Sequence, residues 1–127
     1  MAHFNLTDHI LARGLTTPDR TALIVTDDRR GHASETWSYA DLATAIDAAG
    51  HALLERSARA GDRILLRVGN HSGFPIAFFG ALKAGLVAVP TSTMLTEHEV
   101  AFIARDSGAR LIVSDGSCAL PSDGATP

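Results

Sequence analysis

The sequence predicts an α/β domain with a mainly parallel sheet, flanking helices and an early β-hairpin. From residue 38 onward, runs of branched aliphatic residues alternate with segments of helical periodicity, which indicates parallel strands joined by right-handed crossovers. Before residue 38, two strand-like runs lie on either side of a short polar turn, as in a hairpin. Hydrophobic residues make up 46% of the 127 residues, which is enough for one hydrophobic core.

The individual elements follow from apolar periodicity and from start and stop signals. In chain order they are a helix at about 7–13, strands at 21–26 and 35–38, a long helix that Ser38 caps and Gly61 ends, a strand at 63–68, a helix at 76–84, a strand at 86–89, a helix at about 97–106 and a strand at 111–114. Residues 115–127 are small and polar and show no periodicity, so we expect a flexible tail or linker after a domain that spans residues 1–114.

Helix ends carry recognisable capping residues. Asn5 or Thr7 is expected to cap the first helix, and Thr96 with Glu99 forms a capping box for the helix at 97–106. Gly85 is placed to end the helix at 76–84 in a left-handed conformation, which glycine adopts at little cost.

Three helices have predicted buried sides. The helix at 76–84 is apolar nearly all round and should be buried on most sides. The expected apolar positions of the other two are Leu42, Ile46, Ala49 and Leu53 in the long helix, and Val100, Phe102, Ile103 and Ala104 in the helix at 97–106.

Composition argues against several classes of protein. A net charge of −3 gives no electrostatic reason to expect a nucleic acid or an anionic membrane as partner. The most apolar stretch, residues 74–90, contains Lys83 and is shorter than the ~20 residues of a spanning helix. With no secretory signal pattern and Cys118 as the only cysteine, we expect a cytoplasmic protein.

The loop at residues 69–73, GNHSG, lies between a strand and a helix, where phosphate loops occur. It matches neither the P-loop nor the dinucleotide glycine pattern, and Ser72 is one place too late for a nucleophile elbow. His71 beside it cannot serve as the base of Ser72 by sequence adjacency. We interpret Ser72 as a helix cap and the segment as a connecting loop.

No other side chain carries a chemical signature. The six histidines form no metal-ligand spacing, and Cys118 has no basic neighbour to activate it. Asp27 and Asp28 fit a turn, and Glu97 and Glu99 fit the start of a helix. We therefore assign no catalytic, cofactor-binding or metal-binding residue in this sequence.

Taken in order, several short motifs resemble those of the adenylate-forming superfamily, which covers acyl- and aryl-CoA ligases, peptide-synthetase adenylation domains and luciferases. The motifs are WSYADL at 37–42, GDRI at 61–64 with VGN at 68–70, FFGALKAGLVAVP at 78–90, LTEHEV at 95–100 and SGARLIV at 107–113. The sequence VPTS at 89–92, followed by MLT at 94–96, is similar to that of benzoate-type aryl-CoA ligases. The resemblance implies that the chain is an N-terminal subdomain fragment of the adenylate-forming ligase fold.

Such enzymes join a carboxylic acid to ATP with the help of magnesium, release pyrophosphate, and pass the acyl group to coenzyme A. The family's phosphate loop, ribose-binding acid and C-terminal lysine domain do not occur in the printed sequence. By this resemblance Lys83 is not the catalytic lysine, and Met94 stands where relatives often carry an arginine that meets the CoA nucleotide. The matching residues are structural: Tyr39 anchors the long helix, and Pro90 ends a strand.

Two functions remain open at this point. The first is the N-terminal part of an acid-CoA ligase that is inactive alone, binds no cofactor itself and exposes core surface through which it self-associates. The second is a stand-alone binding or interaction domain that retains the scaffold without catalysis. A third reading, a Rossmann-type oxidoreductase, is disfavoured by the missing glycine fingerprint.

Overall fold

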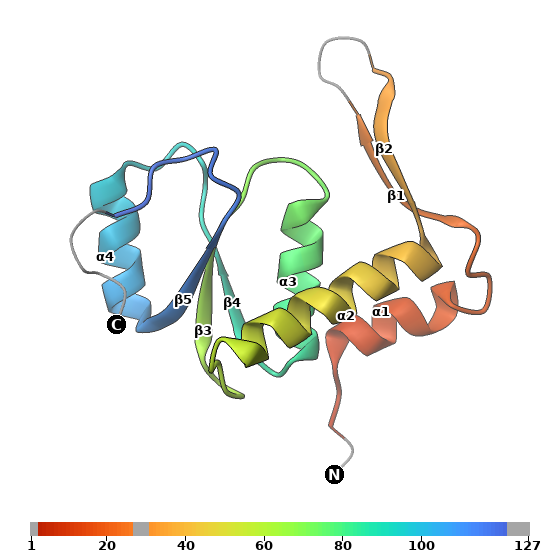
Figure 1. The fold of residues 1–127 in the computed structure, drawn as a ribbon, viewed down its shortest axis with the longest axis horizontal. Coiled ribbons are helices and arrows are strands. Elements are labelled where there is room, and N and C mark those ends of the chain that lie inside the picture. Colours follow the sequence, from red (N-terminus) through yellow and green to blue (C-terminus); the bar gives the residue numbers. More distant parts are fainter. Residues whose placement is uncertain (1–2, 27–30, 122–127) are drawn as a thin grey trace.

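A computed structural model describes residues 3–26 and 31–121, and in this part of the chain the elements occur in the predicted order (Figure 1). They are α1 (Leu6–Gly14), β1 (Thr21–Thr26), β2 (Ala33–Ser38), α2 (Tyr39–Glu55), β3 (Arg63–Arg67), α3 (Gly73–Lys83), β4 (Val87–Pro90), α4 (Glu97–Ser107) and β5 (Ala109–Ser114). The predicted α/β class is confirmed. The predicted turn residues Asp27 and Asp28, and the end of the predicted tail at 122–127, lie outside the described residues.

The main sheet contains three parallel strands in the order β4-β3-β5, and helices cover both of its faces (Figure 1). The central strand β3 alternates its side chains between two cores, as strand geometry requires. Ile64 and Leu66 point toward α2 and α3, whereas Leu65 packs against α4. All three side chains are fully buried, so β3 is the centre of the fold.

Helices α2 and α3 cross at two glycines. A Cβ atom on Gly80 would lie 2.8 Å from the Cβ of Ala49 and 3.0 Å from the backbone nitrogen of Gly50. Leu42, Ile46 and Leu53 are buried as predicted, but the remaining buried position is Gly50, and Ala49 is only half-buried. The close crossing explains the correction, because only a residue without a side chain fits there.

The ends of α3 and β4 follow the sequence signals. Gly85 has φ +76° and reverses the chain after α3, and Pro90 ends β4. No residue of α3 is exposed. The helix begins at Gly73, three residues earlier than predicted.

Helix α4 begins with the predicted capping box of Thr96 and Glu99. Its buried face contains Val100, Ala101 and Ala104, whereas Phe102 is 60% exposed, which corrects the prediction for that residue. At 3.6 residues per turn, position 102 falls opposite the face that positions 100 and 104 share.

The N-terminal helix and the hairpin pack against α2 and α3. Asn5 caps α1, while Thr7 is buried and its hydroxyl donates a hydrogen bond to the carbonyl of Phe79, 2.9 Å away. The ring of Tyr39 lies directly over Gly14, where a Cβ atom would be only 2.0 Å from the ring. Tyr39 thus joins α1 to the start of α2, as expected of an anchor.

Within residues 3–26 and 31–121, none of the helices combines the length and the apolar composition needed to cross a bilayer. Residues 115–121 form neither helix nor strand, but contacts described below hold part of this segment against the end of β3.

Candidate functional site at the carboxyl ends of the parallel strands

Three loops gather where the parallel strands end. They follow β3 at 68–72, β4 at 91–96 and β5 at 115–119, and we call them together the rim; they lie at the top of Figure 1. Ligands of open α/β sheets bind outside the carboxyl ends of the strands. The rim is therefore the candidate functional site of this domain.

A buried arginine links the rim loops to one another. Arg67, the last residue of β3, is only 2% exposed. Its Nη1 donates to the carbonyl of Ser92 at 3.2 Å, its Nη2 to that of Leu95 at 2.8 Å and its Nε to that of Ala119 at 3.0 Å. A planar guanidinium suits this task because its donors point in fixed directions. Arg67 thus fixes the loops after β4 and β5 relative to β3.

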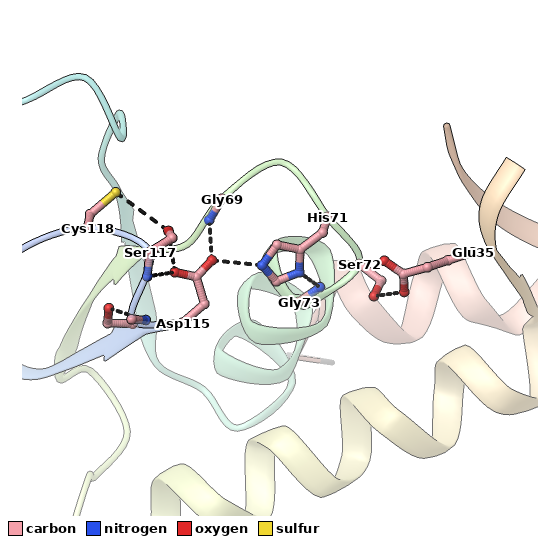
Figure 2. Close-up of polar contacts among 10 residues, drawn as sticks. Glu35, Gly69, His71, Ser72, Gly73, Asp115, Ser117 and Cys118 are labelled. Carbon is pink, nitrogen blue, oxygen red and sulfur yellow. Dashed lines mark hydrogen bonds and ion pairs between the residues drawn. The ribbon is translucent and has the colours of Figure 1, made fainter. Parts of the chain in front are cut away.

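Asp115 is a second centre of polar contacts (Figure 2). Its Oδ2 accepts from the backbone N–H of Gly69 at 2.7 Å and lies 2.7 Å from Nε2 of His71, and its Oδ1 accepts from the N–H of Ser117 at 2.8 Å and the Ser117 hydroxyl at 2.5 Å. The Ser117 hydroxyl, followed by the Gly69 N–H, holds the pKa of Asp115 well below its usual value. The carboxylate stays ionised and ties the loop after β5 to the loop after β3.

His71 is held between Asp115 and the start of α3. Its Nδ1 accepts a hydrogen bond from the N–H of Gly73 at 3.0 Å, so in the neutral ring the proton resides on Nε2 and points at Asp115 (Figure 2). The side chain remains 42% exposed. Its contacts with Asp115 and Gly73 nevertheless give the ring a fixed orientation.

Ser72 does not cap α3, contrary to the prediction. Its backbone is helical, at φ −56° and ψ −26°, and its side chain makes no hydrogen bond to the first N–H groups of the helix. A residue already in helical conformation does not have the extended backbone that caps require. The Ser72 hydroxyl instead donates to the carboxylate of Glu35 on β2 (Figure 2). That carboxylate also accepts from the indole of Trp37 at 3.1 Å. These two donors, Ser72 first, lower the pKa of Glu35.

The structure also places three other residues that the sequence analysis discussed, namely Lys83, Met94 and Cys118. Lys83 is at the end of α3 opposite the rim, where its Nζ is 2.5 Å from Asp47 and 3.8 Å from Asp8. Met94 is 88% exposed in the loop after β4. Cys118 is half-buried, with its Sγ 3.8 Å from the carbonyl of Thr93.

The rim positions loops but does not contain a hydrolytic relay. In a Ser-His-Asp triad the histidine lies between the hydroxyl and the carboxylate. Here Asp115 lies between Ser117 and His71, so the histidine does not face the hydroxyl. Within the described ranges, no three His, Cys, Asp or Glu side chains are arranged to hold a metal ion.

Sequence reasoning missed Arg67, Glu35 and Asp115 as members of this network. One signal was available for two of them: a charged residue that ends an apolar strand, or directly follows one, falls at the carboxyl edge of a parallel sheet. Nothing in the sequence pairs Glu35 with Ser72, because the contact joins the hairpin to a loop 37 residues away.

The fold and the rim define an α/β scaffold domain whose loops at the carboxyl edge are fixed by side-chain contacts. The chain belongs to the AMP-binding enzyme family, whose model matches residues 12–126. This finding confirms the resemblance to adenylate-forming enzymes.

Proteins with a similar sequence include aryl-CoA ligases. The chain is 30% identical over 111 residues to benzoate–CoA ligase of Thauera aromatica, a match that covers 87% of this chain and 20% of that enzyme. A benzoate CoA ligase from Burkholderia xenovorans LB400 superposes with a TM-score of 0.75 at 27% identity, covering 91% of this chain and 22% of that one. The NpsA N-terminal subdomain of Klebsiella oxytoca has a TM-score of 0.80 at 24% identity, over 96% and 30% of the two chains, and shows the fold alone. The chain thus spans about a fifth of the length of the curated relative.

Proposed function

We propose that this chain supplies the N-terminal subdomain of an ATP-dependent acid-CoA ligase that acts on an aromatic or other small carboxylic acid in the cytoplasm. The observation that carries the proposal is the family match over residues 12–126 together with similarity to benzoate–CoA ligase. The whole enzyme would take the acid, ATP with magnesium, and coenzyme A. Its two half-reactions are formation of an acyl-adenylate with loss of pyrophosphate, and attack of the CoA thiol on that adenylate.

The part of this work that falls to the chain is positioning. Catalysis of acyl transfer depends on holding the reacting groups in a fixed geometry. Arg67 and Asp115 hold the rim loops through hydrogen bonds to backbone groups, so the geometry of this edge is set before any ligand arrives. No described residue of the rim has the arrangement of a nucleophile with its base.

We further propose that the 127 residues alone catalyse neither half-reaction, because their sequence includes no family phosphate loop to neutralise the triphosphate. The test is benzoate-dependent ATP–pyrophosphate exchange, measured for the chain alone and for a chimera in which the chain replaces the matching 111-residue segment of the Thauera aromatica enzyme. We expect exchange from the chimera and none from the chain. Circular dichroism confirms that both samples are folded.

A folded chimera without exchange, paired with a chain that binds a defined partner, would favour the stand-alone binding domain instead. Sequencing the reading frame past codon 127 is an independent check. A Ser/Thr/Gly-rich phosphate loop within the next ~50 codons supports the ligase.

A further inference from the structure

The first turn of α3 is capped by His71 rather than by Ser72. The N–H of Gly73 donates to Nδ1 of the imidazole at 3.0 Å, and the N–H of Phe74 donates to the carbonyl of His71 at 3.1 Å. Pro75, the next residue, has no N–H to satisfy. Ser72 makes no capping bond with its side chain. His71 therefore takes the place that Asn, Asp or Ser fills at most helix starts.

The imidazole of His71 is confined on both sides. A Cβ atom on Gly73 would lie 2.6 Å from Cε1 of the ring and 2.9 Å from Nδ1, and one on Gly69 would lie 3.5 Å from Cδ2. At the other ring nitrogen, Oδ2 of Asp115 lies 2.7 Å from Nε2 (Figure 2). Asp115 is itself held by the N–H groups of Gly69 and Ser117. The ring therefore joins the start of α3 to a carboxylate that is already fixed.

The two ring nitrogens have partners of opposite kind. The backbone N–H of Gly73 can only donate, so Nδ1 must carry a lone pair, whereas the Asp115 carboxylate only accepts, so Nε2 must carry the proton. Only the neutral ring satisfies both partners. An imidazolium has an N–H on each nitrogen. It keeps the bond to Asp115, but its second proton faces the N–H of Gly73.

The charges around His71 decide which contact a protonated ring keeps. Two described carboxylates face it: Asp115 from the loop after β5, and Glu35 on β2, whose charge interacts with that of His71. The Ser72 hydroxyl lowers the pKa of Glu35, and the Ser117 hydroxyl holds the pKa of Asp115 well below its usual value, so both stay ionised. Strand β1 on the other side of the loop has only uncharged residues. The start of α3 carries the positive end of the helix dipole, which disfavours a cation. A protonated ring is thus drawn to the carboxylates and away from the helix.

We propose that His71 is a pH-dependent cap of α3, whose neutral ring joins the loop after β3 to the helix and whose protonation releases the first turn while the Asp115 contact remains. Histidine side chains ordinarily change charge between about pH 5 and pH 8. Because this loop is part of the rim, the rim is rigid above that range and loosens below it. The proposal does not depend on the ligase function.

Nuclear magnetic resonance of the whole chain between about pH 8 and about pH 5 tests the switch over the range in which histidine titrates. The imidazole nitrogen shifts of His71 should show the neutral Nε2–H form at high pH and the charged form at low pH. The protection factor of the Gly73 amide, which compares its exchange with that of an unstructured chain at the same pH, should fall about fivefold, the typical effect of one capping bond. The fall should follow the charge of His71, and the amides of α2 should keep their protection.

Three variants separate the cap from other effects of pH. His71→Asn supplies a capping oxygen that does not titrate, so Gly73 should stay protected at both ends of the range. His71→Ala removes the cap, so protection should be low at both ends. His51→Asn is the matched control: Nδ1 of His51, on α2, lies 2.9 Å from the carbonyl of Asp47, and a protonated ring keeps that bond. We expect it to leave the pH response of Gly73 unchanged.

A His71 ring that carries its proton on Nδ1 at high pH, or that remains neutral at the low end of the range, overturns the proposal. A protection factor at Gly73 that still falls with pH in His71→Asn also overturns it, because another group then titrates. Loss of protection that extends to α2 has the same consequence, because the whole fold then responds to pH rather than the cap.

Discussion

Replacement of Arg67 by methionine tests whether the rim is held by one side chain. Methionine keeps the length and apolar stem of arginine but removes the guanidinium. The structure predicts the loss of hydrogen bonds to three carbonyls, those of Ser92, Leu95 and Ala119, which come from two different loops. Because Arg67 is only 2% exposed, its guanidinium lies in the interior of the fold, where water replaces the lost donors only in part.

The size of the effect follows from two opposing terms. A hydrogen bond to a charged group contributes about 1.5–3 kcal/mol, so three bonds amount to roughly 4.5–9 kcal/mol. Against this stands the cost of burying a guanidinium with no carboxylate partner among the described residues, which is several kcal/mol. Ser92 and Ala119 are exposed, so their carbonyls regain some hydration. We expect a net loss of about 2 kcal/mol in the free energy of unfolding.

Urea unfolding measures the global change, and hydrogen exchange measures where it occurs. We expect faster amide exchange at residues 91–96 and 115–121 and little change in α1 or α2. Arg59→Met is the control, because Arg59 is exposed and its guanidinium makes no hydrogen bond or ion pair in the described part of the chain. Equal destabilisation by both substitutions, or unchanged exchange in the two loops, would refute the role of Arg67 as their link.

Three further outcomes follow from the packing and the charges. Gly80→Ala should lower the free energy of unfolding by about 1–2 kcal/mol in urea titrations, because overpacking at the helix crossing exceeds the gain in helix propensity. Adding Ala49→Gly should restore only part of this stability, since two backbone atoms remain within 3.1 Å of the new Cβ. Gly85→Ala should cost about 1–2 kcal/mol because of the positive φ, and Gly85→Asn less, as judged by thermal melts. Ionised Asp115 stabilises the fold above its ordinary pKa of 3.8, and this contribution is lost as the pH falls below that value. Asp115→Asn should therefore make the free energy of unfolding less dependent on pH in the acid range. An unchanged pH dependence would contradict the role of Asp115 in holding the rim loops.

Local signals were sufficient for most of the fold. Strand β3 was recognisable because an apolar run between a turn and a loop has few other solutions, and the capping box of Thr96 and Glu99 marked the start of α4 within one residue. The errors share a physical cause. Whether position 50 or 49 faces α3 depends on how closely two helices approach, and the partner of Ser72 depends on where a distant hairpin docks. Neither the approach of the two helices nor the position of the hairpin can be predicted from the residues next to these positions in the sequence.

The residues that identify the family and those that hold the rim are largely different. Tyr39 packs over Gly14, Gly85 reverses the chain after α3, and Pro90 ends β4, so these motif residues set how helices and strands meet. Arg67 and Asp115 lie outside the motifs and set where the loops stand once the fold has formed. Substitutions in the first group should therefore reduce global stability, whereas substitutions in the second should also displace the carboxyl edge of the sheet. In a ligase built on this scaffold, the first kind of change would lower the amount of folded enzyme, and the second would alter the turnover of the enzyme that remains folded.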